Sequence, residues 1–224
     1  MTTQYDHFCP IARALEIVGD KWSLLIVRDL LDKPQRFSDL MATLGKISPR
    51  LLTQRLRDLE AAGIIERDFQ KGRREVWYRL SAAGLELSPV VDSLLDWGLR
   101  NAMRPPLPGE VLNPELMMRG LTRSLNNKAK GLAGAVRWIM HFPGGTYTIS
   151  YDGQRWSSHP GESPDADVTI TTTPETWARV LTMPRHERCR MAKMIDLDGR
   201  SDKIEGFTAL FGLRAKDSKE KSKV

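Results

Sequence analysis

Residues 37–80 read FSDLMATLGKISPRLLTQRLRDLEAAGIIERDFQKGRREVWYRL, and this stretch decides the fold of the first part of the chain. Its opening, residues 37–44, predicts a short amphipathic helix that a glycine ends. Ser48 then predicts the N-cap of a second helix. Pro49 suits the first position of that helix, where a missing N–H costs nothing. We expect the second helix to occupy residues 48–62 and to stop at the next glycine.

Two short runs with β-strand character follow, Ile64–Gln70 and Glu75–Leu80, and the basic sequence KGRR joins them. Two small helices, a turn and a hairpin with a cationic tip make up a winged helix. These parts suit duplex DNA, because a helix fits the major groove and a basic tip can meet phosphate or the minor groove.

The second helix can be divided into two faces at about 100° per residue. Four leucines fall within an arc of roughly 140° and should face a core: Leu51, Leu52, Leu56 and Leu59. On an isolated helix the opposite side would be an ordinary solvated face, but its place between a turn and a basic hairpin favours DNA contact. The predicted DNA-binding residues, none of them acidic, are Ser48, Arg50, Thr53, Gln54 and Arg57 on the helix and Lys71, Arg73 and Arg74 at the tip.

Arg55 is the exception on this helix, because its angle places it among the leucines. An unpaired charge there would be costly, so it should have an acidic partner or extend its head to the surface. Asp29 and Asp39 on the preceding helices are the candidates for that partner.

Composition agrees with a DNA-binding protein without requiring one. The chain has 224 residues, with 34 basic and 28 acidic side chains and a net charge of +6, which suits polyanions and much else. No apolar run approaches the ~18 residues of a membrane span, and the first ten residues hold no lysine, arginine or apolar segment of a secretory signal. Two cysteines, Cys9 and Cys189, fit a reducing compartment. We therefore expect a cytoplasmic protein without a membrane partner.

The winged core is flanked by further predicted helices, Pro10–Val18 and Lys21–Leu31 before it and a helical region from Ser81 to Arg104 after it. Pro89 should kink or restart the last of these, with Ser88 as a cap. The sequence PPLPG at residues 105–109 predicts a stiff linker. We expect a DNA-binding and dimerisation domain over 1–104, a linker over 105–112, a second domain over 113–212 and a disordered basic tail over 213–224.

The second domain mixes helices with period-two runs. A helix should begin at Asn113-Pro114, another after Thr173-Pro174 and a last one at about Ser201. The predicted strands are Val136–Phe142, Thr146–Tyr151, Gln154–Ser158, Val168–Thr172 and Met194–Asp198. The predicted fold class of the chain is α+β, a winged helix-turn-helix domain followed by a sandwich-like α/β domain with a mainly antiparallel sheet.

Motifs for catalysis are missing from this sequence. It has no P-loop, no G-x-G-x-x-G after a strand and no G-x-S-x-G elbow. His186 and Cys189 stand one helical turn apart, but a metal site usually needs three or four ligands. We expect no enzyme activity, no cofactor and no metal site.

The first hundred residues resemble the HxlR-type family of bacterial winged-helix regulators, relatives of the MarR group. The residues that carry this are Cys9-Pro10, Gly19–Ile26, Arg36–Leu40, Ile47–Pro49, Leu52–Glu60, Val76, Tyr78 and Leu80. One departure is Asp20, where the family usually has a second glycine; an acidic side chain is favourable at a helix start.

The resemblance implies a homodimeric transcription factor that binds inverted repeats of double-stranded DNA. It also implies dimerisation through the first and last helices of the domain. The apolar residues available for this are Ile11, Ala14, Leu15, Val18, Leu87, Val91 and Leu94. The alternative is that these side chains pack together within one chain.

Residues from about 110 to 212 resemble a sterol carrier protein type two domain, through Asp165–Ile170, Thr173–Glu175, Asp196–Gly199 and the closing helix with Phe207 and Phe211. A departure is Met183–His186, where a glycine-containing turn is usual. That family encloses an apolar tunnel, so the resemblance implies a small apolar effector. The candidate ligand-binding residues are Trp138, Met140, Tyr147, Ile149, Trp177, Phe207 and Phe211, and a fully packed core is the alternative.

The sequence therefore predicts a sequence-specific DNA-binding transcriptional regulator, a homodimer on an inverted-repeat operator, modulated by an apolar ligand in the second domain. The alternatives are a carrier of lipids or small apolar molecules whose first domain only dimerises or tethers it, and an enzyme acting on an apolar substrate in the second domain. Cys9 is a candidate redox sensor, because it precedes a helix start where unsatisfied N–H groups favour thiolate. A free cysteine is also commonly a small buried hydrophobe.

Overall fold

The computed structural model describes residues 4–68, 75–128 and 134–214. Its contacts divide the chain into two compact units, Met1–Leu94 and Leu95–Val224. This division falls inside helix α6 (Ser88–Asn101) rather than at the expected linker. The α6 residues from Leu95 onwards belong to the second unit, within which the side chain of Asn127 donates to Asp96 across 3.4 Å.

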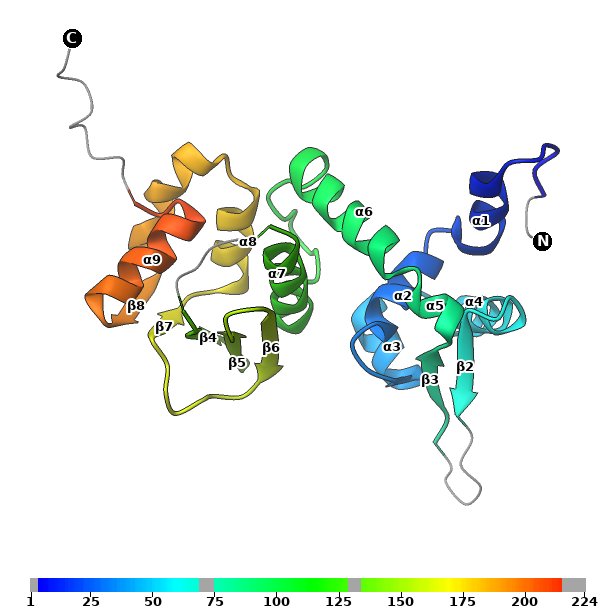
Figure 1. Ribbon diagram of the computed structural model, residues 1–224, viewed down its shortest axis with the longest axis horizontal. Helices are drawn as coiled ribbons and strands as arrows, with labels where there is room; N and C mark the ends of the chain where they lie inside the picture. The colour runs from blue at the N-terminus through cyan, green and yellow to red at the C-terminus, as the bar shows by residue number, and fades with distance from the viewer. Residues whose placement is uncertain (1–3, 69–74, 129–133, 215–224) are drawn as a thin grey trace, which may run out of the picture. The chain divides into compact units, whose positions relative to one another are not determined.

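The first unit is a winged helix. Its helices are α1 (Pro10–Val18), α2 (Ser23–Leu30), α3 (Phe37–Leu44), α4 (Pro49–Ala61) and the short α5 (Ala82–Leu85), and its strands are β1 (Gln35–Arg36), β2 (Ile65–Asp68) and β3 (Trp77–Leu80). The strands form an antiparallel sheet in the order β1-β3-β2. The β2–β3 hairpin extends away from the helices in Figure 1.

The backbone of this unit confirms most of the residues that the sequence predicted to begin and end its helices. The Ser48 hydroxyl accepts from the N–H of Leu51, and Pro49 takes the first helical position. Gly45 and Gly63, which follow the ends of α3 and α4, have positive φ values of 70° and 71°, which glycine adopts without strain. Ser81 caps α5. The predicted restart near Pro89 is confirmed, but Ser88 is the first residue of α6 rather than the cap before it.

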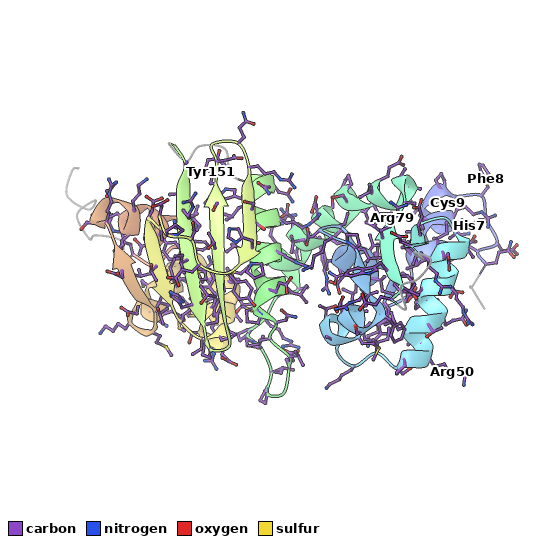
Figure 2. All side chains as sticks on the ribbon, turned by 90° about the horizontal axis from the view of Figure 1, so that it is seen from below. His7, Phe8, Cys9, Arg50, Arg79 and Tyr151 are labelled. Atoms are coloured by element: carbon purple, nitrogen blue, oxygen red, sulfur yellow. The ribbon has the colours of Figure 1, made fainter. Side chains whose placement is uncertain are left out.

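The second unit is built on a five-stranded sheet. Its strands are β4 (Val136–Phe142), β5 (Gly145–Tyr151), β6 (Trp156–Pro160), β7 (Val168–Thr171) and β8 (Asp196–Gly199). The order is β6-β5-β4-β7-β8, and only the β4–β7 pair is parallel, so the sheet is mainly antiparallel as expected. Helices α7 (Pro114–Lys128), α8 (Pro174–Thr182) and α9 (Ser201–Phe211) lie on one face of it (Figure 1), and Figure 2 looks onto the other.

Two elements were absent from the sequence prediction, and several ends moved. These elements are β1 and the 3₁₀ segment η1 (Arg185–Met194). Helix α2 begins at Ser23 rather than Lys21, and the Asp20 carboxylate just before it accepts from the N–H groups of Trp22 and Ser23 at 2.8 and 3.3 Å. The described start of the predicted tail is packed: Leu213 is buried and Arg214 pairs with Glu205 at 2.8 Å. Residues 215–224 lie outside the described part.

Candidate nucleic-acid interface

Helix α4 has two chemically different sides. Leu52, Leu56 and Leu59 are at most 2% exposed and belong to the core of the first unit. The opposite side presents to solvent most of the residues that the sequence selects for DNA: Ser48, Arg50, Gln54 and Arg57 are exposed, and Thr53 is half-buried. Figure 2 shows Arg50 at the N-terminal end of this helix.

Two of the predicted contacts are already engaged within the helix. The Thr53 hydroxyl donates to the Pro49 carbonyl at 2.8 Å, and the Gln54 amide donates to the Asp58 carboxylate at 2.7 Å. Arg50 and Arg57 sit on the same exposed side. This side can therefore offer two guanidinium groups and a fixed amide to a groove.

The predicted hairpin tip, Lys71, Arg73 and Arg74, lies outside the described residues. The strands below it carry cations that the sequence reading missed. Arg67 and Arg79 are exposed on β2 and β3; Arg79 pairs with Glu66 at 2.8 Å, and the Arg67 guanidinium lies 6.0 Å from the centre of the Tyr78 ring. The two arginines lie on the predicted strands that lead to the basic tip, and this position was the signal that could have identified them.

The predicted acidic partners of Arg55 were wrong. Arg55 pairs with Asp58 at 3.2 Å and with Asp20 at 3.6 Å. Asp29 instead is buried and accepts from the Thr43 hydroxyl at 2.7 Å and from Arg28. Asp39 accepts the N–H of Arg36 at the start of α3. Both carboxylates are used in joining or capping α2 and α3, which leaves Asp20 and Asp58 for Arg55.

Large apolar side chains remain exposed on α1 and α6. Ile11 and Leu15 on α1 are exposed, and Val90, Leu94 and Trp97 follow one another at helical spacing on α6. Of the other residues considered for dimerisation, Ala14 is also exposed. Val18, Leu87 and Val91 pack into the core of their own unit, so the within-chain alternative holds for these three.

Cys9 stands at the N-cap of α1 and is half-buried. Its side chain makes no capping hydrogen bond. Figure 2 shows it beside His7 and Phe8, and the Phe8 ring is 98% exposed. Redox sensing by Cys9 stays a prediction.

The structure brings all seven predicted ligand-binding residues into one cluster under the sheet of the second unit. Six are buried and Tyr147 packs against them. The rings contact one another: Trp138 lies 4.7 Å from Trp156 and 5.1 Å from Phe207, centroid to centroid. The sequence analysis did not select Trp156. It predicted the turn and the strand around this residue but not which side chains of that strand face the core.

This aromatic cluster holds polar atoms without partners. Within the described residues, the buried indole N–H groups of Trp138, Trp156 and Trp177 make no hydrogen bond. A buried donor left unpaired costs about 1–3 kcal/mol. Three unpaired indole N–H groups in one core are a reason to look for a molecule that binds there and accepts a hydrogen bond.

Among the described residues, no helix is long and apolar enough to cross a membrane, and no group of three or more candidate metal ligands gathers.

Comparison with known proteins assigns the first unit. The model of the HxlR-like helix-turn-helix family matches residues 17–105. The uncharacterized HTH-type transcriptional regulator YdeP of Bacillus subtilis is 36% identical over 91 residues, which cover 40% of this chain and 71% of that protein. An uncharacterized HTH-type regulator of Methanothermobacter thermautotrophicus is 34% identical over 42% of this chain and 72% of its own.

Among solved structures, the oxidized form of the redox regulator HypR matches 43% of this chain and 100% of its own, with 32% identity and a TM-score of 0.41. Residues 106–224 lie outside the family match. From the sequence matches to its first hundred residues, the chain belongs to the HxlR-like family of helix-turn-helix transcriptional regulators.

Proposed function

We propose that the protein is a cytoplasmic, sequence-specific transcription factor that binds an inverted-repeat operator as a homodimer. Helix α4 would enter the major groove, and the tip of the β2–β3 hairpin would meet phosphate or the minor groove. The observation that supports this most is the exposed, non-acidic side of α4, with Arg50 and Arg57 opposite the buried leucines. Two half-sites would then be read by helices about 34 Å apart.

Selection of bound sequences from random duplex DNA, followed by titrations at several salt concentrations, tests the proposal. Arg57→Ala should relax the preference at one position, at a cost of about 1–3 kcal/mol if Arg57 pairs with guanine. Arg73→Ala should weaken binding to all sequences and lower the salt slope by roughly 0.9 if it touches one phosphate. Arg155→Ala, an exposed arginine of the second unit, is the control. If both variants bind and discriminate like the parent, this arrangement is wrong.

We also propose that the second unit receives the signal as a small apolar molecule that carries a hydrogen-bond acceptor. The three unpartnered indole N–H groups support an acceptor, and the aromatic rings around them support an apolar body. To regulate, this molecule must bind DNA-competent and DNA-incompetent dimers with different affinity, typically by about 1–3 kcal/mol.

Tryptophan fluorescence during titration with decanoate, and with decane as the partner lacking an acceptor, tests the second proposal. Decanoate should change the fluorescence and the operator affinity, and Trp156→Phe should weaken its effect. Trp97→Phe, an exposed tryptophan on α6, is the control. If decanoate and decane changed the fluorescence equally, the ligand would need no hydrogen-bond acceptor. If neither compound changed it, the second unit would have a fully packed core without a ligand site. A protein that binds decanoate but no duplex would be a carrier instead.

A further inference from the structure

Gln54 lies on the exposed side of α4 with its amide orientation already determined. Its Nε2 donates to Oδ1 of Asp58, four residues further along the helix, at 2.7 Å. An ionised carboxylate only accepts hydrogen bonds, so the amide oxygen cannot take the place of the nitrogen there. The carboxylate therefore determines which end of the Gln54 amide points towards it.

Asp58 is itself held in place. Its second oxygen pairs with Arg55 at 3.2 Å, and the same Arg55 nitrogen lies 3.6 Å from Asp20. Asp20 accepts from the first N–H groups of α2 at Trp22 and Ser23. A chain of contacts thus runs from the N-terminus of α2 through Asp20, Arg55 and Asp58 to Gln54. Charge-assisted hydrogen bonds such as the Gln54–Asp58 bond are the stronger kind.

This arrangement leaves a defined pair of groups on Gln54 for a base. One N–H is used by Asp58, and the amide keeps its oxygen as an acceptor and the second N–H as a donor. In the major groove, adenine presents the matching pair, the N6 donor and the N7 acceptor. Guanine presents two acceptors, which would oppose the amide oxygen, and thymine presents an acceptor and a methyl group.

We propose that Gln54 reads adenine in each half-site and that Asp58, held by Arg55 and Asp20, is the positioning residue that fixes this preference. The inference rests on the proposed DNA binding by α4. Without Asp58 the amide can rotate and offer two donors, which suits guanine as well as adenine. The specificity of the helix then depends on a carboxylate that need not touch DNA.

The experiment compares base preferences of the full-length protein and three variants, using duplexes selected by the wild type and then changed at single positions. The wild type should favour adenine at one position per half-site by roughly 5- to 150-fold, the range of a bidentate base contact. Gln54→Ala should lose that preference. Asp58→Ala should reduce it at the same position, chiefly by gaining affinity for guanine.

Glu60→Ala is the matched control, because it removes a carboxylate from the same helix outside this chain of contacts. Both acidic variants should bind nonspecific duplex at least as tightly as the parent, since each loses one negative charge near the polyanion. Glu60→Ala should keep the adenine preference. A merely structural role for Asp58 would lower affinity for every duplex together and leave the preference unchanged, which would overturn the proposal.

Two further results distinguish a failure of the adenine inference from a failure of the proposed DNA binding. If the wild type selects a sequence but Gln54→Ala changes no adenine position, the inference is wrong and DNA binding stands. If the wild type selects no sequence at all, the proposed function fails with it. Asp58→Asn provides a variant with the same shape: its amide can face Gln54 either way, so an adenine preference as strong as that of the wild type would also contradict the role of the charge.

Discussion

At the scale of the residue, Arg55 shows how a charge on the inner side of α4 is accommodated. Its side chain is 22% exposed, and the Asp20 and Asp58 side chains beside it are 26% and 38% exposed. The Asp20 carboxylate serves twice, as the acceptor for two N–H groups at the start of α2 and as a partner of Arg55. The departure from the family pattern at residue 20 therefore has a structural use in this chain.

Replacing Arg55 by methionine should lower thermal stability more than DNA affinity per folded molecule. The substitution leaves Asp20 and Asp58 facing each other without the cation, at a cost of about 1 kcal/mol, or roughly 4–8 °C for a unit of this size. Thermal melts by circular dichroism, with binding corrected for the folded fraction, measure both effects. Unchanged stability together with lost binding would show that Arg55 contacts DNA instead.

At the scale of the element, the wing is attached to the helices through Ile64 and Ser81. The Ser81 N–H donates to the Ile64 carbonyl at 3.0 Å, and the Ser81 hydroxyl caps α5 by accepting from Gly84. Gly84 is buried against the same carbonyl: an added Cβ would lie 2.1 Å from the Ile64 oxygen. Only a residue without a side chain fits there.

Gly84→Ala should therefore destabilise the first unit by roughly 1–3 kcal/mol, because α5 must move away from the hairpin. Gly98→Ala on α6 is the control, since its added Cβ meets nothing within 4 Å and alanine favours the helix by about 0.5–1 kcal/mol. Differential scanning calorimetry should show opposite shifts for the two variants. If Gly84→Ala melted at the same temperature as the wild type, α5 would have moved away from the hairpin without a loss of stability.

At the scale of the whole molecule, the apolar faces of α1 and α6 carry the expectation of a dimer. Leu94 and Trp97 are 49% and 56% exposed, which is unusual for large apolar side chains one helical turn apart. A second copy of the chain that packed against these side chains would bury their apolar surface. Burial stabilises the dimer by about 25 cal/mol for each Å² of apolar surface removed from water.

Leu94→Glu should shift the full-length protein towards monomer and weaken operator binding, because each protomer then reads one half-site alone. Sedimentation velocity at micromolar concentration measures the first effect and a gel-shift titration the second. Leu107→Glu, an exposed leucine beyond α6, serves as the comparison. A wild-type protein that sediments as a monomer at that concentration would contradict the dimer.

The sequence by itself determined the features that depend on neighbours within one or two turns. Ser48, Pro49, Gly63 and Ser81 begin and end elements as predicted, because caps and left-handed glycines act on the adjacent backbone. The leucine period determined which side of α4 is buried, and so which side is exposed to solvent. Alternation and turn signals likewise predicted the strands of the second unit, β4 to β8.

Only the tertiary structure decided the features that join distant residues. One partner of Arg55, Asp58, is three residues further along the same helix, but the other, Asp20, lies before α2, far away in the sequence. Asp29 is not available to Arg55, because Thr43 and Arg28 already engage it. The two-residue strand β1 exists through pairing with β3, and the parallel β4–β7 contact joins segments separated by two other strands. Local signals carry no information on such pairings, since their free energy appears only when the whole chain brings the partners together.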